Sequence, residues 1–349
     1  MISMEEGETP PPQADGAKPA PPRRLLRGFL ALILALGLAG AGAAIFLWRA
    51  LEAPGPLGAA RVLVVAKGAG VDRVARQLSE AGVIAGPLAF VTVARLSGVG
   101  GRLKAGEYEF SAGVSARASL DLLVAGTTVV RKLTVPEGLT TAQIVGLVVQ
   151  ADGLDGGLPE RPPGEGELLP DTYHYSFGDG RAAVIERMKS AMQRALAEQW
   201  ERRAPDLPLA TPYQALVLAS IVEKETGIGA ERARVAAVFV NRLRRGMKLD
   251  ADPTVIYALT RGAVPLDREL TRADLALDDP YNTYRHAGLP PGPIANPGRA
   301  ALGAALAPAA TDELYFVADG SGGHVFARTL EEHSRNVAKW RRVQRTNAN

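Results

Sequence analysis

Two acidic residues follow a long apolar segment near the middle of the chain. Residues 215–226 read ALVLASIVEKET, a run that is apolar up to Val222 except for Ser220 and that then delivers Glu223 and Glu225. A carboxyl group at the end of a buried apolar helix resists ionisation, because desolvation penalises its charged form. The pattern therefore indicates Glu223 as a general acid that stays protonated near neutral pH.

A plainer interpretation of the same residues stays open. Glu223 and Glu225 would then form the solvated end of a core helix and pair with Lys224 or with nearby arginines. A step of two residues turns a side chain by about 200° around a helix, so the two glutamates should not face the same point. We expect Glu225 to form a structural ion pair or to lie in a remote part of the site.

Helix signals surround the apolar segment. Residues 211–214, TPYQ, are typical of a capping box with proline at the first helical position, and Gly227 is placed to end the helix. Apolar residues at helical spacing predict further helices over 181–203 and 231–245. The second of these ends in a basic cluster that includes Arg242, which suits the helix dipole and predicts a solvated helix end.

A segment rich in proline and glycine follows, with tyrosines and amides gathered in it. It covers residues 279–284, DPYNTY, and residues 288–297, GLPPGPIANP. Long irregular segments are often functional, and tyrosine rings with amide groups suit a sugar, because they offer a flat apolar face and fixed hydrogen-bond partners. A proline-stiffened surface loop is the alternative.

Composition excludes several kinds of site. The chain of 349 residues has no cysteine, which excludes disulfides, thiolate catalysis and zinc–thiolate sites. Its four histidines are scattered without metal-binding spacing, so we expect neither a metal nor another cofactor. The formal net charge of +3, with no basic patch interleaved with aromatic residues, gives no reason to expect a nucleic-acid partner.

An apolar run near the N-terminus predicts a membrane anchor. Residues 28–48 carry no charge, and as a helix they span about 30 Å, the thickness of a bilayer core. Arg23, Arg24 and Arg27 precede the run, so the positive-inside rule places the N-terminus in the cytoplasm and the rest of the chain outside it. A cleaved signal peptide is the alternative, but the run is too long and no suitable cleavage site follows it.

Local changes in composition divide the rest of the chain into further parts. We expect a disordered cytoplasmic tail over residues 1–27, a linker over 49–60, a small α+β module over 61–150, and a mixed α/β domain over 151–349. Short strand–turn–helix units recur within the small module. The predicted fold class is therefore α+β, with a single N-terminal transmembrane helix.

Several separated motifs of unusual composition agree with one family. They are VPEG (135–138), EG…LPDTY (165–173), ASIVEKET (219–226), VNRLRRGMKLDADPTVIYAL (240–259), YNTY (281–284), GLPPGPIANPG (288–298) and YFVADGSGGHVFARTLEEH (315–333). Together they resemble the MltG (YceG-like) endolytic murein transglycosylases, which are membrane-anchored enzymes of bacterial cell-wall assembly. The resemblance runs from about Arg61 to Val343, in order.

The resemblance implies a reaction that needs no water. The family cleaves peptidoglycan glycan strands between MurNAc and GlcNAc, and the carbon-6 hydroxyl of MurNAc attacks its own anomeric carbon to leave a 1,6-anhydro end. The first glutamate of the EKE triplet, Glu223 here, is implied as the catalytic residue. The resemblance also implies a LysM-like small module that binds peptidoglycan, and a site at the inner (plasma) membrane beside the peptidoglycan synthases.

Position within the matching motifs and side-chain chemistry indicate the substrate contacts. The candidates are Asp252, Tyr281, Asn282, Tyr284 and Asn296, with Glu225 in a remote part of the site. Two alternatives stay open. A hydrolase of the same polymer would need a second carboxylate near Glu223, such as Asp252. A scaffold without catalytic activity would bind the wall and recruit synthases through its anchor and small module.

Overall fold

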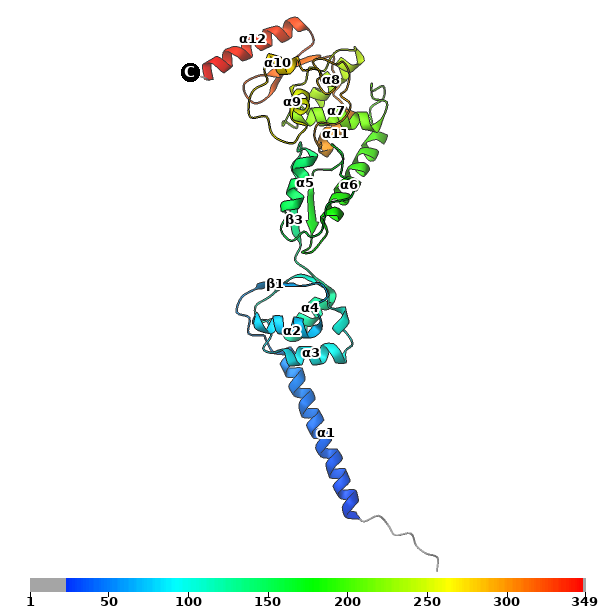
Figure 1. The fold of residues 1–349 in the computed structure, drawn as a ribbon, viewed down its shortest axis with the longest axis vertical. Coiled ribbons are helices and arrows are strands. Elements are labelled where there is room, and N and C mark those ends of the chain that lie inside the picture. The colour runs from blue at the N-terminus through cyan, green and yellow to red at the C-terminus, as the bar shows by residue number, and fades with distance from the viewer. Residues whose placement is uncertain (1–22, 348–349) are drawn as a thin grey trace, which may run out of the picture. The chain divides into compact units, whose positions relative to one another are not determined.

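A computed structural model describes the backbone of residues 23–347 and the side chains of residues 26–345, which form two compact units (Figure 1). The first unit comprises the chain up to Ala105 together with residues 109–127, and the second comprises residues 106–108 and 128–349. Both units mix helices and strands. Most of the predicted tail, residues 1–22, lies outside the described residues, whereas residues 23–27 are helical.

The first unit joins a long apolar helix to a small α+β body. Its elements are α1 (Arg23–Glu52), β1 (Arg61–Val65), α2 (Val71–Glu80), α3 (Pro87–Leu96), a short 3-10 helix (Gly100–Arg102), β2 (Gly106–Phe110), which straddles the division, and α4 (Ala116–Ala125). β1 and β2 form a two-stranded sheet. α1 extends the predicted span of residues 28–48 at both ends, and its stretch Leu26–Glu52 is apolar and long enough to cross a membrane.

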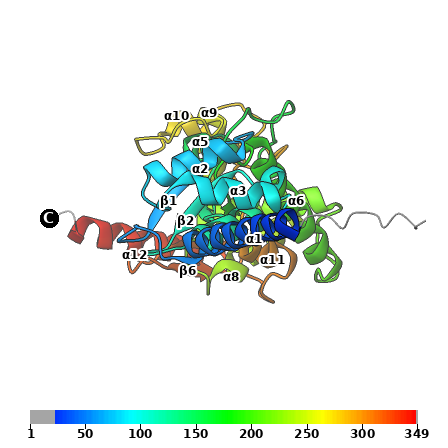
Figure 2. The ribbon, with the colours of Figure 1, turned by 90° about the horizontal axis from the view of Figure 1, so that it is seen from below.

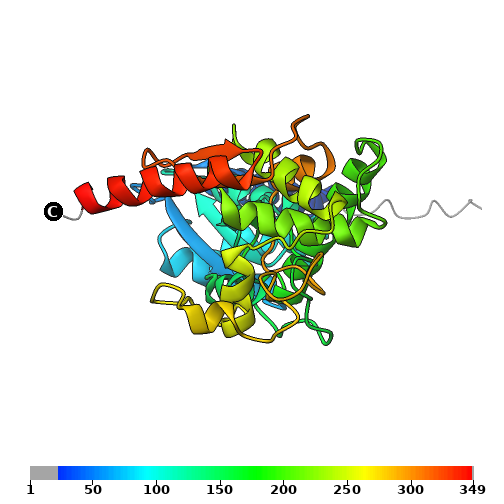
Figure 3. The same cartoon turned by 90° about the horizontal axis from the view of Figure 1, so that it is seen from above.

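The second unit holds the acidic segment. Its elements are β3 (Arg131–Thr134), α5 (Thr141–Gln150), β4 (Thr172–Tyr175), α6 (Arg181–Glu201), α7 (Pro212–Glu225), α8 (Arg232–Arg244), α9 (Asp252–Thr260), α10 (Arg272–Leu275), α11 (Arg299–Leu306), β5 (Tyr315–Ala318), β6 (His324–Ala327) and α12 (Leu330–Asn347). The strands form separate antiparallel pairs, β3 with β4 and β5 with β6. α12 packs against the β5–β6 hairpin and runs along one edge of the unit in Figure 3.

The boundary between the units differs from the one expected at residue 150. β3 pairs with β4, so that Leu133 lies opposite Tyr173, and α5 packs against α6. Both β3 and α5 therefore belong to the second unit, and the first unit ends at residue 127. Sequence distance favoured grouping residues 131–150 with the preceding strand–turn–helix unit, but the strand partner of β3 comes later in the chain.

α7 is the centre of the larger hydrophobic core. Thr211 caps its first turn by accepting a hydrogen bond from the backbone N–H of Gln214 (3.2 Å), and Pro212 is the first helical residue, as predicted. The predicted capping box is only half formed, because the Gln214 side chain accepts from the N–H of Ala210 (2.6 Å) instead of Thr211. All residues from Ala215 to Val222 are buried. α8 and α11 pack against α7, and the ring of Phe239 on α8 meets Phe316 of β5 edge-on at 5.8 Å. The acidic end of α7 therefore projects from a packed core.

The mutation Phe239→Ala tests this packing. Phe239 is 1% exposed, so its loss leaves a cavity and should lower the free energy of unfolding by about 3–5 kcal/mol. Phe177→Ala is the matched control, because Phe177 is 36% exposed and its loss should cost less than ~1 kcal/mol. Urea unfolding followed by far-UV circular dichroism measures both, and equal destabilisation by the two variants would contradict the described core.

Candidate active site

The two glutamates at the end of α7 face different surroundings. Glu223 turns toward the loop after β3 and the start of α11, and its side chain is 6% exposed. Its Oε2 accepts a hydrogen bond from the backbone N–H of Gly298 (2.8 Å), and its Oε1 lies 3.7 Å from Arg232 Nη2. The carboxylate of Glu223 is therefore already engaged by the protein.

Other charged groups lie near the carboxylate of Glu223. Glu137 of the VPEG motif lies 3.9 Å from Arg232 and so close to Gly298 that a Cβ added there would sit 1.7 Å from Glu137 Oε1. Lys224 Nζ donates to the carbonyl of Gly138 at 3.3 Å. Burial raises the pKa of Glu223, and the charge of Glu137 adds to this, while the Gly298 N–H and Arg232 oppose it. The cluster ties α7, α8 and the start of α11 to the VPEG loop.

Glu225 instead lines a cavity of about 560 Å³. The lining residues come from α7, α8, α9, β5, α12 and the intervening loops: Glu225, Arg242, Leu249, Asp250, Asp252, Tyr284, Tyr315, Phe316, Val317, Leu330, His333 and Val337. Burial raises the pKa of Glu225 to about 8, the negative charge of Asp252 adds to the shift, and Arg242 opposes it. Glu225 is therefore a carboxyl group that keeps its proton at neutral pH beside an open space.

Two further predicted residues meet at this cavity. Asp252 is the first residue of α9, and the hydroxyl of Tyr284 donates to its Oδ1 at 2.6 Å. Lys248 Nζ donates to the carbonyl of Tyr284 at 2.8 Å, which fixes the backbone of the YNTY segment. The structure thus brings Glu225, Asp252 and Tyr284 together, and it places Glu223 outside the residues that line this space.

Arg242 forms part of the cavity wall. The prediction of a solvated helix end was wrong for this residue, which is 8% exposed. Its Nε donates to the Leu314 carbonyl (2.7 Å), and its Nη1 donates to the Leu249 carbonyl (3.1 Å) and pairs with Asp250 at 2.7 Å. The guanidinium therefore fixes the loop before α9 and supplies a positive charge that composition and the helix dipole alone did not reveal.

His333 of α12 also reaches the cavity. Its ring stacks on Tyr315 of β5 with centroids 5.1 Å apart, and its Nδ1 is buried without a hydrogen-bond partner. Burial and the charge of Arg242 lower the pKa of His333, so it is neutral at pH 7. From the sequence, this histidine was not singled out among the four in the chain. Its position at the end of the last motif, in the triplet EEH, was the one feature that could have indicated a role in the site.

The remaining predicted contacts lie elsewhere. Tyr281 is partly buried and packs on Tyr257 with ring centroids 4.9 Å apart. Asn282 is fully buried, and its Nδ2 donates to the carbonyls of Leu275 (3.1 Å) and Leu277 (2.7 Å). The side chain of Asn282 therefore holds the turn before the YNTY tyrosines and is not free to bind a sugar.

Asn296 is likewise a buried structural residue. Its Oδ1 accepts from the Leu168 N–H (2.9 Å), and its Nδ2 donates to the Thr141 hydroxyl and to Glu165 Oε1, both at 3.0 Å. Burial raises the pKa of Glu165, and the hydrogen bonds from Thr141 oppose that rise. The amide joins its own loop to the start of α5 and to the segment 165–168, which explains an asparagine in this position without any substrate.

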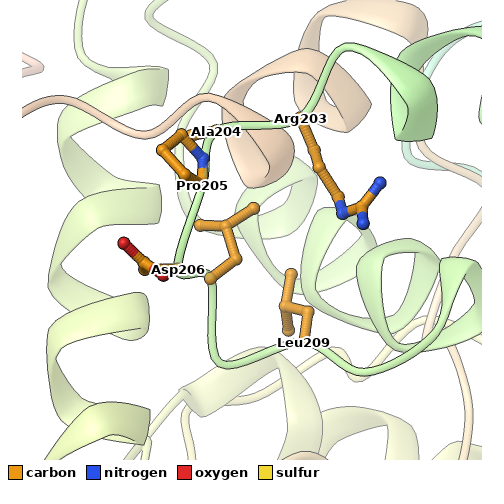
Figure 4. Close-up of a pocket in the computed structure, with 6 residues that line it drawn as sticks. Arg203, Ala204, Pro205, Asp206 and Leu209 are labelled. Atoms are coloured by element: carbon orange, nitrogen blue, oxygen red, sulfur yellow. The ribbon is translucent and has the colours of Figure 1, made fainter.

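A second hollow lies between α6 and α7 and contains none of the predicted residues. It has a volume of about 360 Å³ and is lined by residues 203–207 and Leu209 (Figure 4). Arg244 holds its rim by donating to the Asp206 carbonyl at 3.1 Å. With one carboxylate and no aromatic ring on its walls, it offers less for sugar chemistry than the Glu225 cavity. No cluster of three or more metal-ligating side chains occurs among the described residues.

Comparisons with known proteins match most of the chain. The model of the YceG-like family matches residues 63–339. An endolytic murein transglycosylase of Bacillus subtilis is 32% identical over 311 residues, which cover 79% of this chain and 83% of the relative. An endolytic murein transglycosylase of Streptococcus pneumoniae is 30% identical over 79% of this chain, but the match spans only 57% of that longer protein. The crystal structure of a yceG-like protein from Listeria monocytogenes is 29% identical, with a TM-score of 0.48, and covers 80% of this chain and 99% of that one.

The pH dependence of folding tests the state of Glu225. A folded pKa of about 8 lies above the usual value of 4.5, so the folded protein holds an extra proton between these pH values and loses stability as pH rises through that window. Glu225→Gln removes this loss. The variant should therefore match the wild type near pH 4 and exceed its free energy of unfolding by about 1–4 kcal/mol at pH 8. Urea titrations at both pH values measure the difference, and an unchanged or lower stability at pH 8 would contradict the raised pKa.

Proposed function

Since this chain belongs to the YceG-like family, we propose that it is an endolytic lytic transglycosylase of peptidoglycan in which Glu225 is the general acid and base. Family membership and two relatives named for that activity support an enzyme acting on murein. One observation carries the choice of residue. Glu225 is a protonated carboxyl group on the wall of a cavity of about 560 Å³ that also holds Asp252 and Tyr284.

The proposed reaction uses this single carboxyl group twice. Glu225 gives its proton to the glycosidic oxygen between MurNAc and GlcNAc as the bond from that oxygen to the MurNAc anomeric carbon breaks. The carbon-6 hydroxyl of the same MurNAc then bonds to the anomeric carbon, and its proton passes to the Glu225 carboxylate. Atoms balance without water, and the acid is restored. An intramolecular nucleophile also removes the entropy cost of bringing in a second reactant.

Glu225 suits this role better than Glu223, which the sequence favoured. The carboxylate of Glu223 accepts a hydrogen bond from Gly298 and lies near Arg232, so both of its oxygens already have partners within the protein. Among the described residues, none forms a hydrogen bond or salt bridge with the Glu225 carboxylate. A raised pKa together with access to a cavity is what a general acid requires.

The neighbours of Glu225 extend the proposal. A negative charge on Asp252, held by the Tyr284 hydroxyl, keeps the proton on Glu225 and faces the positive charge that develops at the anomeric carbon. The ring of Tyr315, stacked on His333, supplies an aromatic surface in the same cavity. We assign Asp252 and Tyr284 to substrate binding and charge stabilisation.

A hydrolase is the second candidate, and the position of Asp252 favours it. Hydrolysis needs a second carboxylate to activate water or to attack the sugar, and Asp252 lines the cavity of Glu225. The two reactions differ in their products, because hydrolysis leaves a reducing MurNAc end and transglycosylation leaves a 1,6-anhydro end.

The apolar helix α1 fits a single-pass membrane anchor. In our proposal, the N-terminus lies in the cytoplasm, α1 crosses the inner (plasma) membrane, and both compact units act outside the cytoplasm on nascent glycan strands. A LysM-like, peptidoglycan-binding role for the small module and contact with peptidoglycan synthases belong to the same proposal. Both rest on the family resemblance.

The products of paired variants test the catalytic residue. Peptidoglycan digested by the full chain in detergent should yield 1,6-anhydro-MurNAc ends by mass spectrometry. Glu225→Gln should lower the rate by a factor of about 10²–10⁴, because a general acid is lost and the fold is kept. Glu223→Gln should retain activity to within about tenfold, since it affects a structural hydrogen bond.

The other outcomes of this experiment are equally specific. Loss of activity in Glu223→Gln alone would return the acid role to Glu223. Reducing ends in place of anhydro ends would identify a hydrolase and point to Asp252. Peptidoglycan binding without cleavage by the wild type would favour the scaffold.

The pH–rate profile tests the coupling between the two carboxylates. Cleavage by the wild type should fall as pH rises through about 8, because Glu225 then loses its proton. Asp252→Asn removes a negative charge beside Glu225, so the ionised form becomes easier to reach and the alkaline limb should move to lower pH by about half a unit to one unit. Asp267→Asn is the control, because Asp267 is exposed and does not line the cavity, and it should leave the alkaline limb in place. An alkaline limb that stays in place in Asp252→Asn would contradict the coupling.

A further inference from the structure

We propose that helix α3 of the first unit lies on the membrane, and that a groove between α3 and the outer end of α1 takes up lipid acyl chains. This inference rests on the proposed anchoring of α1 and is independent of the assignment of Glu225. It concerns a surface of the small module that the reaction chemistry does not use.

The groove is apolar and belongs to one unit. Its volume is about 560 Å³, and α1 and α3 supply its walls. The residues that matter here are Phe46, Leu47 and Ala50 of α1, and Leu88, Ala89 and Thr92 of α3. No charged residue lines it. The two helices are in contact, and both views of the unit show α3 beside the end of α1 (Figures 1 and 2).

α3 has apolar residues on two opposite faces. Phe90 and Ala94 are fully buried and join α3 to the body of the unit. Leu88 and Leu96, eight residues apart and thus on one side of the helix, are 74% and 79% exposed. A leucine side chain left in water loses the favourable free energy of burial. A helix of this kind is typical of a surface that meets an apolar partner.

The position of the groove along α1 identifies that partner. The stretch Leu26–Glu52 has 27 residues, about 40 Å of helix, whereas a bilayer core takes up about 30 Å. The last turns of α1 therefore reach the headgroup layer. Phe46, Leu47 and Ala50 lie in these turns, and Trp48 lies between them, as is common at the membrane interface. Because α3 contacts this end of α1, its exposed leucines lie at the same depth.

Lipid is therefore the occupant that the geometry favours. One wall of the groove is formed by the helix that must itself be surrounded by acyl chains, so the groove continues the lipid-facing surface of α1. Arg95, in the last turn of α3, has a side chain that is 63% exposed and pairs with Asp72 at 2.7 Å, so polar groups suited to the headgroup layer lie beside the exposed leucines. A soluble protein would have to cross the headgroups to reach Leu88.

Site-specific probes can test this contact in the full chain, because it has no cysteine. Single variants Leu88→Cys and Leu96→Cys are labelled with an environment-sensitive fluorophore and reconstituted in vesicles of phosphatidylethanolamine and phosphatidylglycerol. Val62→Cys on β1 is the matched control, since Val62 is also apolar and 47% exposed. Leu36→Cys, in the middle of α1, reports on the anchor itself.

The expected result is a blue-shifted emission at positions 88 and 96. Quenching there by a lipid-attached nitroxide should be several-fold stronger than at position 62, and quenching by aqueous iodide several-fold weaker. One result would overturn the inference and leave the anchor intact: the probe at position 36 lies in lipid, but the probes at positions 88 and 96 are quenched by iodide as strongly as the probe at position 62. Position 36 in water would overturn the anchor and this inference together, without bearing on the role of Glu225.

Discussion

The continuous burial of α7 is the constraint on which the rest of the second unit depends. Eight successive residues, Ala215 to Val222, are enclosed by neighbouring helices and loops on all sides. The helix cannot turn or slide without exposing apolar surface, so the directions in which its last side chains leave the core are fixed. Glu223 and Glu225 consequently enter two separate environments, one closed by peptide groups and cations and the other open to a cavity. Desolvation by the same core raises the pKa of both.

The position of the irregular segment ANPG (residues 295–298) in turn depends on α7. The hydroxyl of Ser220, the polar residue within the buried run, accepts a hydrogen bond from the backbone N–H of Ile294 at 3.0 Å. Two residues later, the side chain of Asn296 hydrogen-bonds to groups of two other segments, and the N–H of Gly298 donates to Glu223. A long loop without regular secondary structure is thus anchored to the core, because buried polar groups of Ile294, Asn296 and Gly298 find partners there. The amide of this segment therefore has a structural role in the second unit.

The parts of this arrangement that follow from local chemistry could be predicted from the sequence. The start of α7 at Pro212, the apolar helix that became α1, and an acidic group with a raised pKa at the end of α7 all depend on neighbouring residues. Which glutamate meets the open space depends on how α9, β5 and α12 pack around α7, and that information is spread over a hundred residues. Helical periodicity indicated that the two carboxylates point in different directions, but it could not indicate which of them faces a cavity. Arg242 shows the same limit, because a basic residue at a helix end looks solvated until the loop that covers it is known.

Because the last helix forms part of the cavity wall, the cavity can be complete only after the end of the chain has been synthesised. Leu330, His333 and Val337 of α12 form part of the wall that faces Glu225, although they lie far downstream of it in the sequence. A chain synthesised from its N-terminus presents α7 well before these residues. The carboxyl group therefore has no complete enclosure until nearly the whole second unit has been made and folded. For the enzyme proposed above, cleavage thus depends on the last helix, because α12 completes the wall that faces Glu225.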